Sequence, residues 1–198
     1  PEFRNTAFGN NGATITDLIH HTSGLPRDLG IYPRELPKVI EAVKELKNVN
    51  PTGSHSYSNI GYVLLQHAME RATGQSYSEL LTHYLNPATG ISPISTSKEA
   101  TEKGVPEGYV PFYMGNRTVS DPVRDDEAGE GYLAGTGRQL ATYGTWQLRQ
   151  HQQGQLPSTF STVPTGEGSS EYGAGLEYAK ATSSIDGSEV EIVSHNGA

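Results

Sequence analysis

Apolar residues recur along the first part of the chain with the period of amphipathic helices. They are spaced by three and four positions over 35–47 and again over 59–72, so one face of each helix can pack against a core. A shorter apolar stretch at 14–21 begins with threonines that can cap a helix, and Gly24 and Pro26 follow it as stop signals. The pattern therefore predicts three helices before residue 75.

A fourth helix is indicated at 76–85, where Ser76 and Glu79 have the spacing of a capping box. We expect this helix to end at Asn86-Pro87, because the residue before a proline disfavours the helical conformation.

The middle of the chain, 87–135, has little periodicity and many Pro, Gly and Ser residues. We therefore predict long ordered loops there, with one short helix at 97–103. A longer helix is predicted at 136–152, and its apolar side would carry Leu140, Tyr143 and Leu148.

The end of the chain changes to strand-forming sequence. Strands are predicted at 171–181 and 188–195, and Ile185-Asp186-Gly187 supplies the turn, because Gly adopts the positive φ that tight hairpins need. An isolated hairpin is marginal in water and normally joins a larger sheet. The predicted fold class is α+β, mostly helical with part of an antiparallel sheet, and we expect further strands outside this chain.

Composition narrows the classes of function. The chain has 198 residues, no cysteine and a net charge of -8. Disulfides and thiolate metal sites are therefore excluded, and the lack of a basic tract argues against nucleic acid as a partner. No apolar run approaches the roughly 18 residues that span a bilayer, so no membrane segment is expected. The histidines have no zinc-binding spacing, and we expect no metal and no cofactor.

Candidate chemistry lies at the start of the helix predicted over 59–72. The run that enters it is Pro51-Thr52-Gly53-Ser54-His55-Ser56-Tyr57-Ser58-Asn59-Ile60-Gly61. A phenol such as that of Tyr57 can relay a proton near a cation, since positive charge favours its ionised form. The amide of Asn59 could contact a substrate. The same residues could also be structural, with Ser58 or Asn59 capping the helix and Tyr57 packed beneath.

Together with His21-Thr22-Ser23-Gly24-Leu25-Pro26, this run resembles the serine β-lactamase and penicillin-binding protein-like hydrolase superfamily. Within it, the class C β-lactamase, esterase and D-aminopeptidase branch is the most similar. The resemblance extends from about residue 13 to 198 and implies a β-lactamase/transpeptidase-like fold. We interpret 1–198 as part of one such domain, with a helical and loop region at 13–165 and a hairpin of the antiparallel sheet at 170–198.

The resemblance also implies roles for particular residues. Tyr57 would be the general base or proton relay, and Asn59 would contact substrate. His195-Asn196-Gly197 stands where the family has Lys-Thr-Gly, so His195 would position substrate or tune Tyr57, and Gly197 would let substrate approach the strand edge. A histidine is only partly charged near neutral pH, which favours an esterase, amidase or D-amino-acid peptidase over a β-lactamase. The loop at 21–26 is expected to be a packing and turn element.

The nucleophile of the family, a Ser-x-x-Lys, is expected before His21, and nothing there fits. We therefore expect the nucleophilic serine and its lysine upstream of residue 1. Ser95-Thr96-Ser97-Lys98 has the formal pattern but follows Tyr57, which is the wrong order for the family. Thr96 to Glu99 fits a capping box better.

Three functions remain open from the sequence. The first is a serine hydrolase that acts through an acyl-enzyme on an ester, an amide or a D-amino-acid peptide, so its partner is a small-molecule or peptide substrate. The second is a non-catalytic penicillin-binding-like module that binds a peptide or a partner, and the third is an acyltransferase. The isolated chain is expected to be inactive and marginally stable. The resemblance slightly favours a secreted or cell-envelope protein, while compartment and oligomeric state stay open.

Overall fold

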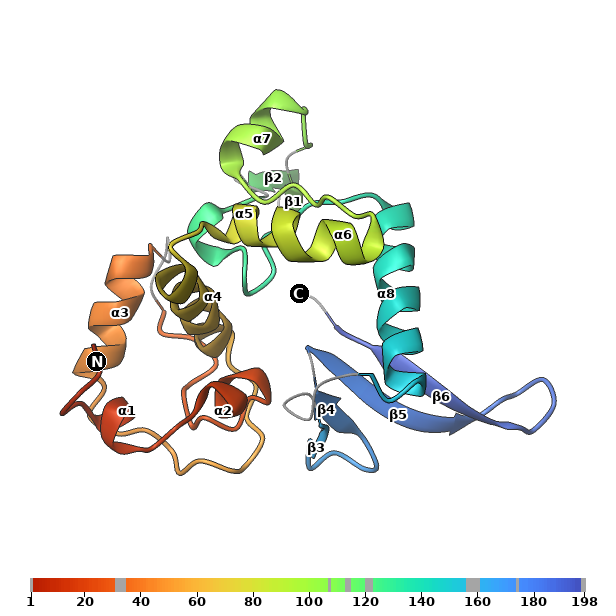
Figure 1. The fold of residues 1–198 in the computed structure, drawn as a ribbon, viewed down its shortest axis with the longest axis horizontal. Helices are drawn as coiled ribbons and strands as arrows, with labels where there is room; N and C mark the ends of the chain where they lie inside the picture. The colour runs from red at the N-terminus through yellow and green to blue at the C-terminus, as the bar shows by residue number, and fades with distance from the viewer. Residues whose placement is uncertain are drawn as a thin grey trace. The chain divides into compact units, whose positions relative to one another are not determined.

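The computed structural model describes residues 2–30, 35–106, 108–112, 115–119, 123–155, 161–173 and 175–196, with 108–112 and 115–119 as backbone only. The chain forms two compact units that interleave in sequence. The first unit comprises Pro1–Ile31, Pro37–Tyr62 and Gln147–Ala198, and the second comprises Tyr32–Leu36 and Val63–Trp146. Figure 1 gives the labels of the elements.

Short capped helices open the first unit. They are α1 (Ala7–Asn10), α2 (Ile15–Ile19) and most of α3 (Leu36–Glu45), followed by the start of α4 (Asn59–Thr73). Thr14 and Asp17 form a complete capping box at the start of α2, which satisfies amides that the helix itself leaves free. The buried Val39 and Val43 lie four positions apart on α3, as its periodicity predicted. The helices predicted at 14–21, 35–47 and 59–72 are confirmed, each with ends within a few residues.

A four-stranded antiparallel sheet completes the first unit. Its strands are β3 (Val163–Pro164), β4 (Glu171–Gly173), β5 (Leu176–Thr182) and β6 (Glu189–Ser194), in the order β3-β4-β5-β6 (Figure 1). Tyr178 of β5 is paired with Val193 of β6. Gly187 has a φ of 74° in the turn between them, and its amide donates to the Ser183 carbonyl oxygen at 3.0 Å. The strand predicted at 188–195, the turn before it and the α+β fold class are therefore confirmed. The single strand predicted at 171–181 is wrong, because the chain turns at Gly175, with a φ of 79°, and forms two strands, β4 and β5, that pair with each other.

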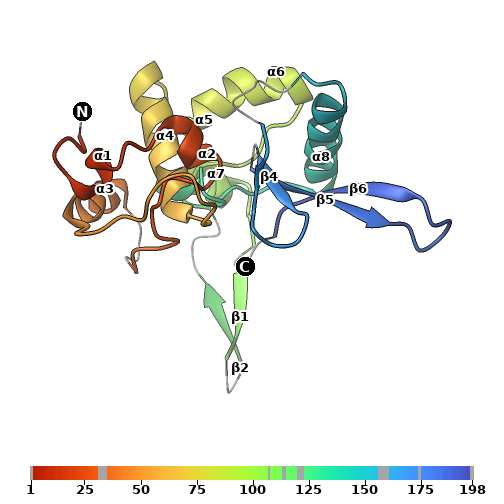
Figure 2. The same cartoon turned by 90° about the horizontal axis from the view of Figure 1, so that it is seen from below.

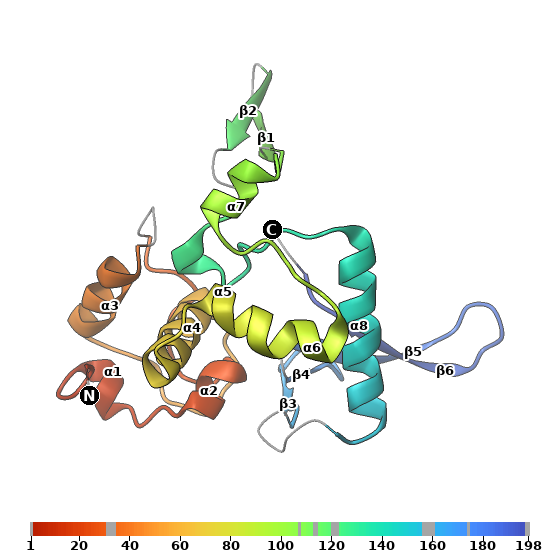
Figure 3. The same cartoon turned by 45° about the horizontal axis from the view of Figure 1, so that its top comes forward.

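One helical segment of the second unit continues past its predicted end. In Figure 3, α5 (Tyr77–Leu80), a π-helical turn η1 (Leu81–Leu85) and α6 (Asn86–Thr89) follow one another without a break. The predicted stop at Asn86-Pro87 is wrong. Pro87 lies in the first turn of α6 after the wider π turn, a position where its missing N–H removes no helical hydrogen bond. Gly90, with a φ of 72°, ends the segment instead.

The middle of the chain contains more regular structure than its sequence predicts. Besides α7 (Ser97–Glu102), which was expected, it holds β1 (Gly108–Phe112), β2 (Gly115–Val119) and the single turn η2 (Asp125–Glu127). Strands β1 and β2 pair antiparallel as a ribbon (Figure 2). The short helix predicted at 97–103 is confirmed, but the prediction of loops over the rest of 87–135 is wrong, because a two-stranded ribbon does not require hydrophobic alternation.

Helix α8 (Gly137–Gln152) confirms the helix predicted at 136–152. Its residues up to Trp146 belong to the second unit, and the rest belong to the first. Leu140, which the pattern placed on an apolar side, is 72% exposed. The helix was predicted correctly, but this part of its predicted apolar face is wrong.

A buried glutamine explains why the aperiodic segment after residue 122 is ordered. Gln66 on α4 donates through Nε2 to the Asp125 carbonyl oxygen at 2.8 Å. Its Oε1 accepts the Gly129 amide at 2.7 Å. One buried side chain thus satisfies two backbone groups of a loop that has no ladder of its own.

Candidate active site

The segment that carries Tyr57 lies beside the loop 21–27, and both belong to the first unit. Backbone hydrogen bonds join the two along their length. They run from the amides of Asn50, Gly53, Ser56 and Asn59 to the carbonyl oxygens of Gly24, Thr22, His21 and Arg27, at 3.1, 2.9, 2.7 and 3.1 Å. The loop therefore has the packing role expected for 21–26, and it also supports the backbone on both sides of Tyr57.

Ser58 is the N-cap of α4. Its side chain is fully buried, and its hydroxyl donates to the Pro26 carbonyl oxygen at 2.7 Å. The Ser58 hydroxyl oxygen also accepts a hydrogen bond from the Gly61 amide at 3.1 Å, which is the bond that defines an N-cap. The capping interpretation is thus correct for Ser58, and it fixes Tyr57 one residue before the helix.

Tyr57 and His195 are brought together from positions 138 residues apart. The Tyr57 Oη lies 3.4 Å from the His195 Nε2, at the long end of hydrogen-bond geometry. Catalytic contacts are often this long before substrate binds. The guanidinium of Arg27 lies 5.3 Å from the centre of the Tyr57 ring, so a permanent positive charge stands over the phenol. The sequence did not single out Arg27.

Asn59 and Gly197 are the two remaining residues that the sequence proposes for substrate contact. Asn59 is the first residue of α4, half-buried, and its amide donates to the Arg27 carbonyl oxygen. No hydrogen bond of its side chain occurs among the residues that the structure describes, and its proposed contact with substrate stays a prediction. Gly197 lies outside the described residues, so its proposed role at the strand edge stays a prediction.

A buried histidine that the sequence assigned only to packing lies directly against Tyr57. The ring centres of His21 and Tyr57 are 4.2 Å apart. The His21 Nδ1 accepts the Ser58 amide at 3.0 Å, and its Nε2 lies 3.0 Å from the Tyr172 Oη. Burial, together with the nearby His55 and His195, lowers the pKa of His21 from 6.5 to about 3. His21 is therefore neutral at physiological pH.

The hydrogen bonds also fix which nitrogen of His21 carries the proton. Because Nδ1 accepts an amide, the proton of the neutral ring lies on Nε2 and is donated to Tyr172. Burial raises the pKa of Tyr172, and so does a hydrogen bond to Tyr62, as expected when Tyr172 is the donor. The Tyr62 hydroxyl in turn donates to the Ile19 carbonyl oxygen at 3.0 Å. A single directed chain of hydrogen bonds thus runs beneath Tyr57.

His55 is the third histidine of this cluster. Its ring centre lies 5.8 Å from that of His21 and 5.4 Å from that of Tyr172. Burial lowers the pKa of His55, and Glu177 and Glu167 oppose that shift. The site residues that the sequence missed are therefore His21, Arg27, His55 and Tyr172. The sequence signal for them was weak: His21 and His55 lie inside the two quoted motifs, at 21–26 and 51–61, but nothing in the sequence indicated that they lie close to Tyr172.

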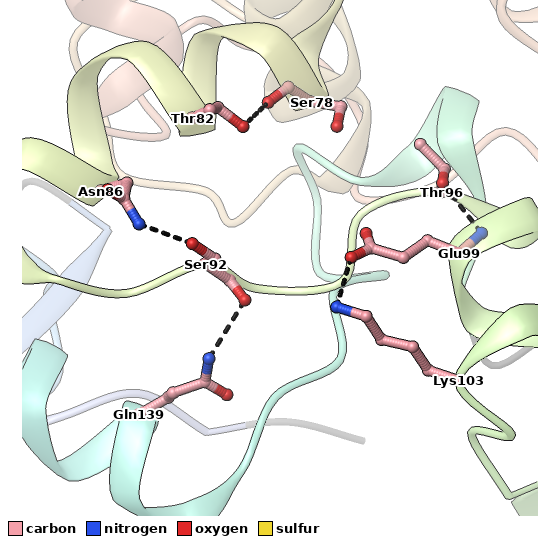
Figure 4. Close-up of polar contacts among 8 residues, drawn as sticks. All are labelled: Ser78, Thr82, Asn86, Ser92, Thr96, Glu99, Lys103 and Gln139. Carbon is pink, nitrogen blue, oxygen red and sulfur yellow. Dashed lines mark hydrogen bonds and ion pairs between the residues drawn. The ribbon is translucent and has the colours of Figure 1, made fainter.

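The formal Ser-x-x-Lys at 95–98 does not form a nucleophilic pair. Ser95 is buried, whereas the Lys98 side chain is 85% exposed and lies 3.9 Å from Glu102. Thr96 caps α7, since its Oγ1 accepts the Glu99 amide at 3.2 Å (Figure 4). The second half of the predicted capping box is replaced by an ion pair of Glu99 with Lys103 at 2.6 Å.

The residues around this segment in Figure 4 also make contacts that hold helices and loop together. Ser92 accepts from Asn86 through its hydroxyl at 2.6 Å and from Gln139 through its carbonyl oxygen at 3.1 Å. These bonds connect α6 and α8 through the intervening loop.

In the described part of the chain, no three His, Asp or Glu side chains are placed to hold a metal ion together. The described helices are also too short or too polar to cross a membrane.

Comparison with known proteins identifies the class. The profile of the Beta-lactamase family matches residues 1–198, and the chain belongs to this family. It is 31% identical over 97 residues to a putative D-alanyl-D-alanine carboxypeptidase of Escherichia coli K12, covering 44% of this chain and 22% of that protein. It is 34% identical over 85 residues to penicillin-binding protein 4* of Bacillus subtilis 168, covering 37% and 19%.

Solved structures confirm the fold. A class C β-lactamase superposes with a TM-score of 0.67 at 18% identity, covering 93% of this chain and 52% of that one. An octameric penicillin-binding protein homologue from Pyrococcus abyssi superposes with a TM-score of 0.66 at 23% identity, covering 90% and 46%. The chain thus spans about half the length of these structures, and its matched part covers about a fifth of the curated relatives. The fold is α+β and β-lactamase/transpeptidase-like.

Proposed function

We propose that this chain is part of a serine hydrolase that works through an acyl-enzyme, with Tyr57 as general base or proton relay. The observation that carries the proposal is the 3.4 Å approach of the Tyr57 Oη to the His195 Nε2, beneath the charge of Arg27. The phenol of Tyr57 is half-buried, the exposed His195 lies at its oxygen, and the permanent positive charge of Arg27 lies over its ring. These are the surroundings of a proton-transfer group.

The reaction follows from these positions. A serine supplied by the segment upstream of residue 1 attacks the substrate carbonyl carbon, while Tyr57 accepts the hydroxyl proton. The proton then passes to the leaving group as the bond from carbon to that group breaks, which leaves an ester on the serine. Water attacks the carbonyl carbon of this ester in the second half of the reaction, and Tyr57 takes its proton. Tyr57 then gives the proton to the serine oxygen as the bond from carbon to that oxygen breaks, which releases the acid and restores the serine. His195 orients the phenol, and the amide of Asn59 holds the substrate.

An ester, an amide or a D-amino-acid peptide is the proposed substrate class. The name of the Escherichia coli relative, a putative D-alanyl-D-alanine carboxypeptidase, supports a peptide substrate. A histidine at 195 in place of a lysine removes a permanent charge that would favour a carboxylate. Acyl transfer uses the same acyl-enzyme with a different acceptor, so product analysis with an added amine separates it from hydrolysis.

The test requires the chain extended upstream until it includes a Ser-x-x-Lys. We expect Tyr57→Phe to lower kcat/KM on p-nitrophenyl acetate, D-alanine p-nitroanilide or nitrocefin by on the order of 10²–10⁴-fold. Tyr84→Phe is the matched control, since Tyr84 is 63% exposed on η1. An unchanged rate in Tyr57→Phe would remove the proposed role.

The non-catalytic alternative is tested on the product of the whole parent reading frame. A fluorophosphonate probe should attach one label per chain, on the serine of the upstream Ser-x-x-Lys. If the parent reading frame contains no such motif and no label is found, the chain is a peptide- or partner-binding module instead.

A further inference from the structure

We propose that His21 is a positioning residue for Tyr57, acting as an uncharged imidazole that ties the backbone next to Tyr57 to the buried phenol of Tyr172. This inference rests on the proposed role of Tyr57. It assigns a function to a loop that the sequence explained by packing alone.

His21 holds the chain on both sides of Tyr57. Its carbonyl oxygen accepts the Ser56 amide at 2.7 Å, and its side-chain Nδ1 accepts the Ser58 amide at 3.0 Å. Its ring also lies against the Tyr57 ring, with centres 4.2 Å apart and a tilt of 36°. One residue therefore restrains the backbone before Tyr57, the backbone after it and the plane of its ring.

The backbone conformation of His21 supports a use for its side chain. His21 has a φ of 56°, in the left-handed region that Gly adopts without strain and that other residues seldom adopt. A position needed only for a turn would be satisfied by glycine, as at Gly24 in the same loop with its φ of 77°. At His21 the strained conformation is kept together with an imidazole that bonds through both ring nitrogens.

The surroundings require the neutral form with its proton on Nε2. A charged imidazole would carry a second N–H on Nδ1, and that donor would face the Ser58 amide, which is itself a donor. On the other side, Tyr172 is held as the acceptor, because its own proton is donated to Tyr62. Tyr62 is anchored in turn on the Ile19 carbonyl oxygen. The position of the imidazole, and hence of Tyr57, is thus set from the interior of the first unit.

Two substitutions separate positioning from packing. Asn at position 21 accepts the left-handed conformation and places an amide oxygen where Nδ1 stands, so His21→Asn keeps the bond from Ser58. His21→Ala loses that bond, and both variants lose the contact with Tyr172. In the upstream-extended chain we expect His21→Ala to lower kcat at least about tenfold, with KM changed less than about threefold. His21→Asn should recover most of the lost kcat.

Tyr172→Phe is the variant to use if His21→Ala does not fold. It keeps the ring but removes the acceptor of the His21 Nε2 proton. We expect a several-fold loss of kcat, with the His21 proton still on Nε2, because the Ser58 amide continues to face Nδ1. Wild-type kcat in folded His21→Ala, or in Tyr172→Phe when His21→Ala is unfolded, would overturn the inference.

A measurement that needs no activity completes the test. Nitrogen-15 NMR of histidine-labelled chain distinguishes the two neutral tautomers from the imidazolium, and His21→Asn assigns the signal. We expect the Nε2-protonated neutral form at pH 7, and an Nδ1-protonated or charged ring would overturn the inference. If Tyr57→Phe is fully active, the proposed function fails. If Tyr57→Phe is inactive while His21→Ala keeps the wild-type kcat, only the present inference fails.

Discussion

Gly24 lies so close to Asn50 that a Cβ on Gly24 would be 1.9 Å from the Asn50 carbonyl oxygen. This close approach joins the loop 21–27 to the segment that carries Tyr57. The Asn50 amide donates to the Gly24 carbonyl oxygen at 3.1 Å, so the two backbones are in contact where no side chain fits.

The first prediction concerns this contact. We expect Gly24→Ala to destabilise the chain by at least ~2 kcal/mol more than Gly12→Ala, as measured by urea denaturation. Gly12 is a matched control, because it has the same φ of 77° but nothing within 4 Å of an added Cβ. Its own substitution should cost about 1 kcal/mol for the left-handed backbone. Equal losses in the two variants would mean that the segments do not meet as described.

The second prediction concerns the pH dependence of stability. Burial lowers the pKa of His21 to about 3 and lowers that of His55 as well. Between the folded pKa and the ordinary value of 6.5, the unfolded chain binds a proton that the folded chain does not. The free energy of unfolding therefore falls as the pH falls below 6.5, by up to about 1.4 kcal/mol per pH unit for His21, and His55 adds to the fall in the same direction.

His21→Asn should reduce this slope by about one proton between pH 6.5 and 4.5. Asp17, Glu79 and Asp186 also have lowered pKa values, but they are present in both chains, so the difference between the two slopes reports on His21. Denaturant melts at several pH values provide the measurement. A slope identical to that of the original chain would show that His21 titrates normally.

The third prediction concerns the cap of α4. Ser58→Ala removes the acceptor of the Gly61 amide and leaves the Pro26 carbonyl oxygen without the hydroxyl it accepts from. We expect a loss of about 2 kcal/mol, because the bond to the Gly61 amide is buried and the bond to the Pro26 carbonyl oxygen is partly buried. Ser76→Ala is the comparison, since Ser76 caps α5 at an exposed position. It should cost about 1 kcal/mol or less, and a larger loss for Ser76→Ala than for Ser58→Ala would contradict the burial argument.

The fourth prediction concerns the loop tied by Gln66. Gln66→Met keeps the volume but leaves the Asp125 carbonyl oxygen and the Gly129 amide without this partner. We expect a loss of about 2–4 kcal/mol and faster hydrogen exchange confined to 123–135. Gln75→Met, at a half-buried position in the same unit with no side-chain bond of this kind, should have little effect. Unchanged exchange over 123–135 in Gln66→Met would show that the loop is ordered by other contacts.

Local patterns predicted the local elements. Capping residues identified α2 and α5 because a cap depends on side chains three positions apart, which a sequence shows directly. Pro87 misled the prediction, since a π-helical turn before it changes which amides need partners. The pairing of β1 with β2 also escaped, because neither segment alternates between apolar and polar residues.

The candidate site was only partly predictable for a related reason. Tyr57 and His195 were paired through a family resemblance, and the structure brings them together. His21 and Tyr172 lie 151 positions apart, and neither stands in a pattern that indicates contact. Their partnership depends on how the loop 21–27 and the sheet pack, which the periodicity of either segment does not contain.

The chain of hydrogen bonds beneath Tyr57 begins at a backbone amide, that of Ser58, and ends at a backbone carbonyl, that of Ile19. An amide proton is not acidic at working pH, and a carbonyl oxygen has no proton to give. This chain of hydrogen bonds therefore cannot carry a proton from one end to the other, although its imidazole and phenol groups can carry protons in other settings. The interior of the first unit therefore offers Tyr57 no route for a proton, and any proton that Tyr57 gives or takes moves on the side of its hydroxyl where His195 lies.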